Sequence, residues 1–453
     1  MCENIGFFIN FATISHRRQI MKYWEESIEC MNRSDLEKLQ LERLKDTIRK
    51  ASIAPFYQNL FKKNRINAET IHSLDDISKL PFTTKDDLRN NYPFGLAAVP
   101  INQVVRLHSS SGTTGNPTVV LHTQKDLDEW ANQVARCMYM VGLRDSDVFQ
   151  NTSGYGMFTG GLGFQYGAER LGALTIPAAA GNSVRQIKFI RDFGTTAIHA
   201  IPSYATRLAE VFEEMGLDPR KDTKLTTLCI GAEPHSEEQR KRIEKLLGVK
   251  AYNCFGMSEM NGPGVAFECP EQNGLHIWED YVFVEILNPE TLEPVRDGEV
   301  GELVLTTLNR EAMPLIRYRT RDLTRTLPGN CPCGRTHKRI ARLQGRSDDM
   351  IIVKGVNIFP IQIEKILMNF KELGMNYLIT IETIGNSDEM LIEVELGDLP
   401  IDDYLELQSL AKKITYQLKD ELLITPKVRL VSRGTIPQSE GKAVRVKDLR
   451  KLH

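Results

Sequence analysis

The sequence predicts an α/β protein of two parts, a large N-terminal domain with more than one sheet and a small α+β C-terminal domain. At 453 residues the chain is too long for one ordinary domain. In its middle, short apolar segments such as Ala197–Ile201 and Leu225–Ile230 alternate with helical stretches such as Glu237–Leu247. Such alternation is typical of a largely parallel sheet that is covered by helices.

Two helices are predicted before this region. Residues Ser34–Glu37 have the spacing of a capping box, and apolar residues then recur on one helical face until Pro55. A second helix is expected over Thr123–Gly142, with a threonine as its N-cap and a glycine as its stop. Residues 1–20 look detached from the rest of the chain and are expected to be an N-terminal extension.

The pattern changes to antiparallel strands in the second half of the chain. Tyr281–Leu287 and Glu299–Thr306 flank a turn that contains proline and glycine. Further on, Tyr377–Thr383 and Met390–Leu396 are predicted to pair across a Gly-Asn turn, and Tyr404–Lys419 to form an amphipathic helix. These last elements predict the small α+β domain.

The composition excludes several classes of protein. The chain has 57 Lys and Arg against 59 Asp and Glu, a formal net charge of −2, which argues against a nucleic-acid binder or a polybasic membrane-surface protein. No apolar run reaches the roughly 18 residues of a membrane span, and Ile5–Ile14 lacks the flanks of a secretion signal. The 8 cysteines are too sparse for a disulfide scaffold, so a cytoplasmic location is expected.

The strongest local motif is a loop of hydroxyl side chains with two glycines, Ser109–Thr118, between an apolar segment and a strand. Hydroxyls and closely approaching backbone amides suit a polyphosphate. The spacing does not fit a P-loop NTPase, because no lysine follows at the required place. A flexible Ser/Gly linker is the alternative. The predicted phosphate ligands are Ser109, Ser110, Ser111, Gly112, Thr113, Thr114 and Gly115.

This loop resembles the phosphate loop of the adenylate-forming enzymes, the superfamily of acyl-CoA synthetases, peptide-synthetase adenylation domains and luciferases. Further segments resemble that superfamily in the same order, namely Gly231–Pro234, Tyr252–Glu259, Tyr318–Asp322, Gly345–Pro360 and Pro437–Lys442. From Met21 onward the chain most resembles the phenylacetate–CoA ligase branch.

The resemblance implies an AMP-forming ligase that converts an aromatic acid, ATP and CoA into acyl-CoA, AMP and diphosphate through an acyl-adenylate. Because two anions must approach each other, Mg²⁺ and fixed cations are needed to offset their repulsion. The expected partners are small molecules, and neither nucleic acid nor a membrane is expected. A homodimer is left as one alternative for the oligomeric state. A carrier-protein thiol or an amine is the alternative acceptor, and a catalytically idle protein that binds nucleotide and metal is the remote alternative.

The resemblance also assigns roles to residues. Glu259 would bind Mg²⁺, Arg346 would grip phosphate, and Lys442 would bridge the carboxylate and the α-phosphate. Asp322 would hold both ribose hydroxyls, and Asp348 would be the hinge of a mobile lid. The remaining nucleotide contacts are predicted at Gly231, Ala232, Glu233, Pro234, Asn253, Phe255, Gly256, Met257 and Ser258.

Aromatic residues interleaved with glycines predict a flat pocket for the acid. Tyr155 and Phe158 lie in a glycine-rich segment, and Pro202–Tyr204 and Asn253–Phe255 are expected to form the other walls. Gly231 and Gly256 are also expected to contact the acid. These residues favour an aryl acetate over a long fatty acyl chain. The alternative is that both aromatic residues belong to an ordinary core.

Two positions depart from the superfamily pattern. Asn116, which is uncharged, stands where such loops often carry a lysine. Arg321 replaces the glycine of the general Tyr-Arg-Thr-Gly-Asp pattern, and the phenylacetate branch shows this arginine too.

A structural zinc site is predicted from one histidine and three cysteines, Cys269, His276, Cys331 and Cys333, with His337 as the substitute ligand. Some phenylacetate-type ligases resemble this chain in carrying such a metal. The alternative is a set of reduced cysteines and histidines in loops.

The expected domains are therefore an extension over 1–20, an AMP-binding domain over 21–345 with a zinc-bearing β region at about 265–340, and a lid over 346–453.

Overall fold

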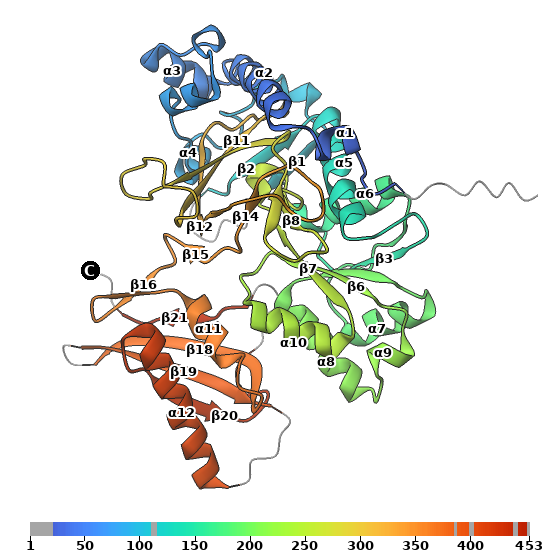
Figure 1. Cartoon of the computed structure of the whole chain (residues 1–453), viewed down its shortest axis with the longest axis vertical. Coiled ribbons are helices and arrows are strands. Elements are labelled where there is room, and N and C mark those ends of the chain that lie inside the picture. Colours follow the sequence, from blue (N-terminus) through green and yellow to red (C-terminus); the bar gives the residue numbers. More distant parts are fainter. Residues whose placement is uncertain (1–20, 110–115, 385–386, 398–402, 438–442, 451–453) are drawn as a thin grey trace, which may run out of the picture.

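The computed structural model describes residues 21–109, 116–384, 387–397, 403–437 and 443–450, which form a large and a small lobe (Figure 1). The large lobe extends to β15 (Gly345–Arg346), and the small lobe begins with β16 (Ile351–Val353). In Figure 1 the small lobe, orange to red, lies beside α10 (Glu237–Leu247) of the large lobe. The predicted extension over residues 1–20 lies outside the described residues.

A nine-stranded mixed sheet organises the large lobe. Five of its strands run parallel in the order β7-β6-β5-β3-β4, and β8, β9, β14 and β13 continue the sheet antiparallel beyond β7. The strands are β3 (Val148–Asn151), β4 (Leu174–Ile176), β5 (Ala197–Ala200), β6 (Thr227–Gly231), β7 (Lys250–Phe255), β8 (Ala266–Glu268), β9 (Leu275–Ile277), β13 (Thr326–Leu327) and β14 (Arg339–Ile340). The predicted parallel sheet is confirmed.

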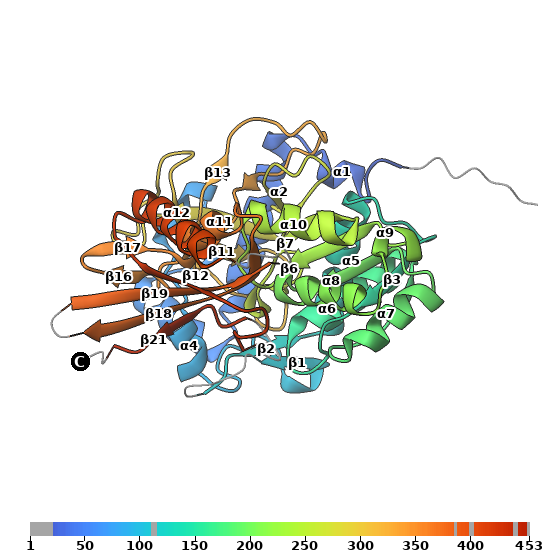
Figure 2. The ribbon, with the colours of Figure 1, turned by 90° about the horizontal axis from the view of Figure 1, so that it is seen from below.

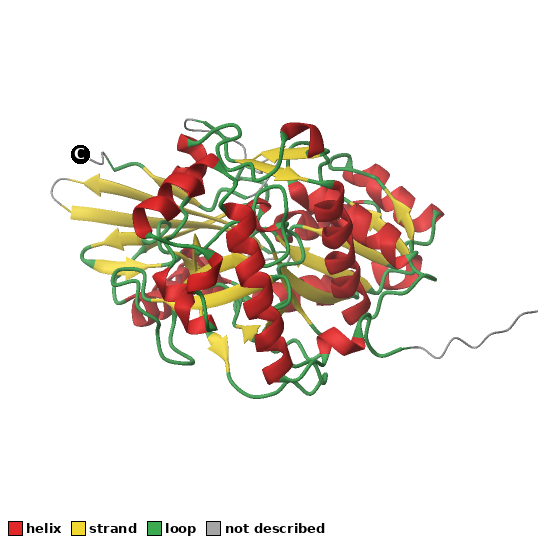
Figure 3. Ribbon diagram, turned by 90° about the horizontal axis from the view of Figure 1, so that it is seen from above, coloured by secondary structure: helices red, strands yellow, loops and turns green. Residues whose placement is uncertain are grey.

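Helices bury both faces of the parallel strands (Figure 3). They are α5 (Gln124–Met140), α6 (Thr159–Leu171), α7 (Ser183–Asp192), α8 (Pro202–Glu214) and α10 (Glu237–Leu247). Ile198 and Leu228 share a buried cluster with residues of α7, α8 and α10. Their neighbours Ala197 and Cys229 share another with residues of α5 and α6. This alternation explains why β5 and β6 consist mainly of apolar residues, as is typical of strands buried on both faces.

Two smaller sheets complete the large lobe. The first is the hairpin of β1 (Arg106–Ser109) and β2 (Val119–His122). The second is an antiparallel sheet, in the order β10-β11-β12-β15, of β10 (Val282–Leu287), β11 (Gly301–Thr307), β12 (Tyr318–Thr324) and β15. The predicted antiparallel region is confirmed, and its last strand leads directly into the small lobe.

The small lobe is an α+β unit, as predicted. Its four-stranded sheet has the order β20-β19-β18-β21, and two helices lie on one side of the long β18–β19 hairpin (Figure 2). The elements are β17 (Val356–Ile358), α11 (Pro360–Leu367), β18 (Leu373–Ile384), β19 (Ser387–Leu396), α12 (Tyr404–Leu422), β20 (Lys427–Val431) and β21 (Val446–Asp448), and β17 pairs with β16. The apolar face of α12 buries Leu410, Ile414 and Leu418.

The N-terminal helices are α1 (Glu26–Glu29), α2 (Arg33–Ala51), α3 (Pro55–Asn64) and α4 (Lys85–Asn90), and the short α9 (Pro219–Asp222) follows α8. The predicted cap of α2 is wrong: the side chain of Asn32, not Ser34, accepts from the Asp35 amide, so the helix begins earlier than expected. The predicted Thr123 cap of α5 is confirmed. Among the described residues, no helix is both long and apolar enough to cross a bilayer.

Candidate active site and metal cluster

The predicted phosphate loop connects β1 and β2, which pair from Arg106 opposite His122 to Ser109 opposite Val119. Residues 110–115 lie outside the described part of the chain, and of the predicted ligands only Ser109 is described. Ser109 is buried, and its backbone N–H donates to the carbonyl of Met157 at 3.1 Å. The start of the loop therefore contacts the glycine-rich segment that was predicted to receive the acid.

Parallel strands β6 and β7 bring two predicted nucleotide segments together. Gly231 at the end of β6 lies opposite Cys254 on β7, and a Cβ on Gly231 would come within 2.2 Å of the Cys254 carbonyl oxygen. Ala232 then turns the chain with a φ of +66°. A Cβ on Gly256 would lie 2.7 Å from the Cα of Pro263. Both glycines are thus required by close backbone packing.

Glu233 connects its motif to two other parts of the chain. Its carboxylate accepts hydrogen bonds from the backbone N–H and the hydroxyl of Ser203, at 3.0 and 2.9 Å, where α8 begins. It also accepts from the backbone N–H of Ala443 in the small lobe at 2.6 Å. Lys442, the residue before Ala443, lies outside the described residues. The residue that follows Lys442 in the chain therefore contacts the predicted nucleotide-binding segment Gly231–Pro234.

Glu259 lies in the turn after β7 and is buried. The Tyr318 hydroxyl donates to Glu259 Oε1 at 3.3 Å, and Arg310 Nη1 donates to the Glu259 carbonyl at 2.6 Å. Ser258 Oγ lies 3.2 Å from the hydroxyl of Thr159 at the start of α6. Among the described residues, Tyr318 is the one hydrogen-bond partner of the Glu259 carboxylate, so the chemistry of the site fits a divalent cation.

Asp322 and Arg346 are brought together because they are opposite each other on β12 and β15. Arg346 Nη1 lies 3.8 Å from Asp322 Oδ1, while Nε and Nη2 bind Asp348 at 2.8 and 2.9 Å. Burial raises the pKa of Asp322 to about 7, although the Arg346 charge opposes this shift. Hydroxyl donors such as those of a ribose would favour the ionised form of this carboxyl group.

Arg321 has a φ of +68°, in the left-handed region that favours glycine. The register between β11 and β12 shifts near this residue, and Arg321 Nη1 lies 3.7 Å from Glu302. The position that departs from the superfamily pattern therefore keeps a glycine-like backbone while carrying a charged side chain.

The predicted acid-binding residues follow the carboxyl ends of parallel strands. Tyr155 follows β3 and Tyr204 follows β5, on the same sheet edge as Gly231 at the end of β6. The Tyr155 hydroxyl donates to Gln165 at 2.8 Å, and burial raises the pKa of Tyr155 to about 12. Phe158, the N-cap of α6, is 53% exposed, which does not fit an ordinary core residue.

Sequence reasoning missed a buried histidine beneath this segment. His199 on β5 stacks on Phe164 with 4.0 Å between ring centroids, and its Nδ1 lies 2.8 Å from the Ser153 hydroxyl. Burial lowers the pKa of His199 to about 3, so it is neutral. A histidine inside the apolar strand Ala197–Ala200 was the available signal.

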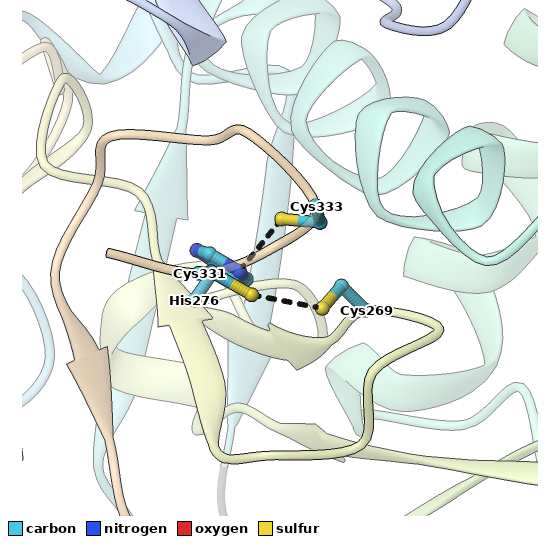
Figure 4. Close-up of side chains that lie close together, drawn as sticks. All are labelled: Cys269, His276, Cys331 and Cys333. Carbon is cyan, nitrogen blue, oxygen red and sulfur yellow. Dashed lines mark hydrogen bonds between the residues drawn. The ribbon is translucent and has the colours of Figure 1, made fainter. Parts of the chain in front are cut away.

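The four predicted metal ligands form one buried cluster (Figure 4). Their candidate ligand atoms all lie within 4.8 Å of one another, with 3.6 Å between the sulfurs of Cys269 and Cys331 and 3.3 Å between Cys333 Sγ and His276 Nε2. The edges of a tetrahedral zinc–thiolate site with ~2.3 Å bonds measure about 3.8 Å. Hydrogen bonds from Cys269 and His276 lower the pKa of Cys333. Spacing and donor set therefore fit zinc.

The substitute ligand His337 does not join this cluster. Its Nδ1 accepts from the Glu279 amide at 3.0 Å, and its Nε2 lies 3.0 Å from the Ile28 carbonyl. The turn that contains Cys333 also binds the N-terminal segment, because Tyr23 donates to the Cys333 carbonyl at 3.1 Å. A metal at the cluster would thus support the attachment of that segment.

Three comparisons place these features among known proteins. Residues 43–309 match the family described as AMP-binding enzyme, and residues 355–450 match the AMP-binding enzyme C-terminal domain. The phenylacetate-coenzyme A ligase of Escherichia coli K12 is 44% identical over 430 residues, which cover 94% of this chain and 98% of the relative.

Solved structures of 2-hydroxyisobutyryl-CoA ligase are similar to the whole chain. The structure in the postadenylation state with R3-HIB-AMP is 29% identical, has a TM-score of 0.89, and is aligned over 98% of this chain and 95% of the other. The structure in the thioesterification state with 2-HIB-AMP and CoA is 31% identical, with a TM-score of 0.71 over 95% of this chain and 93% of the other.

Proposed function

The chain belongs to the AMP-binding enzyme family, on the branch of the phenylacetate–CoA ligases, and from that premise we propose that it converts an aryl acetate, ATP and CoA into acyl-CoA, AMP and diphosphate. The observation that carries this proposal is the pair of Asp322 and Arg346 at the joint between the lobes, on a sheet whose Tyr318 contacts Glu259. Adenylate formation needs a carboxylate that binds the ribose, a cation that binds phosphate and a second carboxylate that binds Mg²⁺.

The reaction has two steps. A carboxylate oxygen of the acid attacks the α-phosphate of ATP, and the bond to diphosphate breaks. The CoA thiolate then attacks the acyl carbon, and AMP leaves with the carboxylate oxygen that attacked the α-phosphate in the first step. Stabilisation of phosphate charge, rather than proton transfer, dominates the first step because both reactants are anions.

Each residue has a separate task in this proposal. Arg346 grips phosphate, Asp322 accepts hydrogen bonds from the ribose hydroxyls, and Lys442 bridges the carboxylate and the α-phosphate. Glu259 would hold Mg²⁺, which when bound supplies further positive charge at the phosphates. The hydrogen bond from Ala443 to Glu233 supports the role of Lys442, because it attaches the adjacent residue to the nucleotide motif.

The small lobe acts as a lid that turns about Asp348, which lies between β15 of the large lobe and β16 of the small lobe. It delivers Lys442 for adenylation and then presents another face for CoA. The double hydrogen bond between Arg346 and Asp348 at 2.8 and 2.9 Å supports this place for the hinge.

The acid is aromatic and small. Tyr155, Phe158 and Tyr204 supply its flat surfaces, and the backbone at Gly231 and Gly256 completes the pocket. The exposure of Phe158 at the start of α6 supports this assignment over a core role.

Cys269, His276, Cys331 and Cys333 would hold a structural zinc, which when bound supplies cross-links between two loops. All four ligands come from the protein, so no open position is left for chemistry. We also place the protein in the reducing cytoplasm, which agrees with the free cysteines of its described residues.

The test is ATP-dependent diphosphate release with a panel of aromatic and aliphatic acids, with and without CoA. The proposal expects release with phenylacetate or a related aryl acid, and formation of the thioester when CoA is added. Acyl transfer to a carrier protein in preference to free CoA would contradict the acceptor. Absence of diphosphate release with every acid would contradict the proposal as a whole.

A further inference from the structure

Glu364 is a buried carboxylate of the small lobe that contacts the large lobe directly. It lies on α11 and is 2% exposed. One carboxylate oxygen accepts from the backbone N–H of Ser236 at 2.6 Å, and the other accepts from the Tyr377 hydroxyl at 2.9 Å. Ser236 belongs to the large lobe and Tyr377 to the small lobe, so this one side chain joins the two.

The contact lies at the beginning of a helix. Ser236 is the N-cap of α10, and its own side chain accepts from the Gln239 amide at 3.1 Å. The N–H groups at the start of a helix lack partners within the helix and favour a negative charge. Helices α10 and α11 contact each other along this interface and are adjacent in Figure 1.

Glu364 depends on these donors. Within the described ranges, no lysine or arginine forms an ion pair with it. Burial raises the pKa of Glu364, and the Ser236 amide and the Arg445 charge oppose that shift. A buried carboxylate without a close cation is stabilised by the hydrogen bonds that it accepts. Any rotation of the small lobe that moves Ser236 away therefore removes one of the hydrogen bonds that stabilise the buried Glu364 carboxylate.

Neighbouring contacts hold the same orientation of the lobes. Arg242 Nη2 on α10 donates to the Leu373 carbonyl at 2.6 Å, and the Ala443 amide binds Glu233. This orientation fits the postadenylation structure of 2-hydroxyisobutyryl-CoA ligase better than the thioesterification structure of the same enzyme, with TM-scores of 0.89 and 0.71.

We propose that Glu364 is a positioning residue that holds the lid against the start of α10, and so favours the orientation that forms the acyl-adenylate over the one that forms the thioester. The inference rests on the proposed two-step function. A contact made in only one orientation shifts the population toward that orientation.

The experiment measures both half-reactions separately in Glu364→Ala. ATP–diphosphate exchange is expected to fall about tenfold, the effect of losing one hydrogen bond to a charged group. Thioester formation from supplied acyl-adenylate and CoA is expected to stay the same or to rise, because loss of the contact shifts the population toward the orientation that forms the thioester. A role in stability alone would lower both half-reactions together.

Two comparisons between variants isolate the contact between the lobes: Glu364→Ala with Tyr377→Phe, and Ser236→Pro with Ser236→Ala. Tyr377→Phe removes only the hydrogen bond within the small lobe and is expected to leave the ratio of the two rates unchanged. Ser236→Ala and Ser236→Pro both remove the side-chain cap, but only the proline removes the N–H that binds Glu364, and the Ser236 φ of −77° suits proline. The ratio is expected to fall more in Ser236→Pro than in Ser236→Ala, because the alanine variant loses only the weaker side-chain hydrogen bond to Glu364 and keeps the N–H.

Hydrogen exchange gives a readout that needs no activity. In Glu364→Ala, amides at the start of α10 and in β18 are expected to exchange faster, while those of α5 keep the wild-type rate. Unchanged exchange at α10, or an equal fall of both half-reactions, would overturn the role of Glu364. Absence of diphosphate exchange in the wild-type protein would instead refute the proposed function. The hydrogen exchange result would still show whether Glu364 holds the small lobe against the start of α10.

Discussion

Two clusters of polar residues, the four predicted metal ligands and the charged residues at the joint between the lobes, differ in how far their side chains are exposed to solvent. Cys269, His276, Cys331 and Cys333 are all buried, and their ligand atoms lie within 4.8 Å of one another. At the joint between the lobes, Arg346 and Asp348 have 32% and 53% of their side chains exposed. The first cluster supplies a complete set of ligands to one ion, which is typical of a structural metal site. The second leaves charged groups accessible, which is typical of a site that binds a ligand. We call the metal-ligand cluster the closed cluster and the one at the joint, with Asp322, Arg346 and Asp348, the open cluster.

The largest expected effect is on the open cluster. Arg346→Ala should lower the rate of ATP–diphosphate exchange by about 100- to 1000-fold, because a fixed cation at the phosphates is lost where charge develops. The melting temperature should change little, since Arg346 is partly exposed. Exchange kinetics and thermal unfolding on the same preparation check both statements.

Arg450→Ala is the matched control for this variant. Arg450 also binds two carboxylates, Asp448 and Asp388, but within the small lobe. Its loss should leave the exchange rate near that of the wild-type protein. Equal losses in both variants would mean that the arginine at the joint has no special role.

The closed cluster should respond in the opposite way. Cys333→Ser should lower the free energy of unfolding by about 3 kcal/mol, because the metal and its cross-link are lost. The rate per folded molecule should change little. Metal analysis should find one zinc per chain in the wild-type protein and in Cys30→Ser, whose thiol is outside the cluster, and none in Cys333→Ser. A catalytic loss without a loss of stability would reverse the assignment.

The pKa of Asp322 gives the open cluster a pH dependence. Burial raises this pKa to about 7, and the unfolded chain has a value of about 4. Between these values the folded protein retains a proton that the unfolded chain has lost, so this group lowers stability as the pH rises from about 4 to about 7. Ribose hydroxyls favour the ionised carboxylate, so nucleoside affinity should rise with pH.

Adenosine is the appropriate ligand, because it has no phosphate that titrates in this range. Its affinity should increase by up to about tenfold between pH 6 and pH 8, as measured by calorimetry. The increase should vanish in Asp322→Asn. An affinity that does not depend on pH in the wild-type protein would show that Asp322 does not hold the ribose.

The smallest effect concerns the segment that the closed cluster supports. Tyr23→Phe removes the hydrogen bond to the Cys333 carbonyl and should cost about 1 kcal/mol of stability. Zinc content and the exchange rate should remain those of the wild-type protein, as chemical denaturation, metal analysis and kinetics would show. Loss of zinc would mean that the N-terminal segment maintains the cluster, rather than the reverse.

Sequence patterns predicted the features that depend on local periodicity or on side-chain chemistry. The helix expected over Glu237–Leu247 coincides with α10, and the Thr123 cap is present. The four metal ligands were predicted because three cysteines and one histidine supply the donor set of a tetrahedral zinc site. Where two local patterns competed, sequence alone was insufficient: Asn32 caps α2, although Ser34 and Glu37 have the more familiar spacing.

Contacts that join distant parts of the chain could not be predicted. The Ser153–His199 pair and the Ser236–Glu364 contact each need two segments to be placed by the sheet and by the lobes. Glu364 in particular lies on an amphipathic helix, where a glutamate ordinarily faces water. Its burial becomes evident only when the lobes are in contact.

The most direct test of the central claim traces one oxygen atom. The enzyme is given ¹⁸O-labelled phenylacetate, ATP and CoA, and the AMP is analysed by mass spectrometry. An acyl-adenylate formed at the joint between the lobes requires one labelled oxygen in each AMP and the other in the thioester. Unlabelled AMP, or label found only in phosphate or diphosphate, would contradict the account.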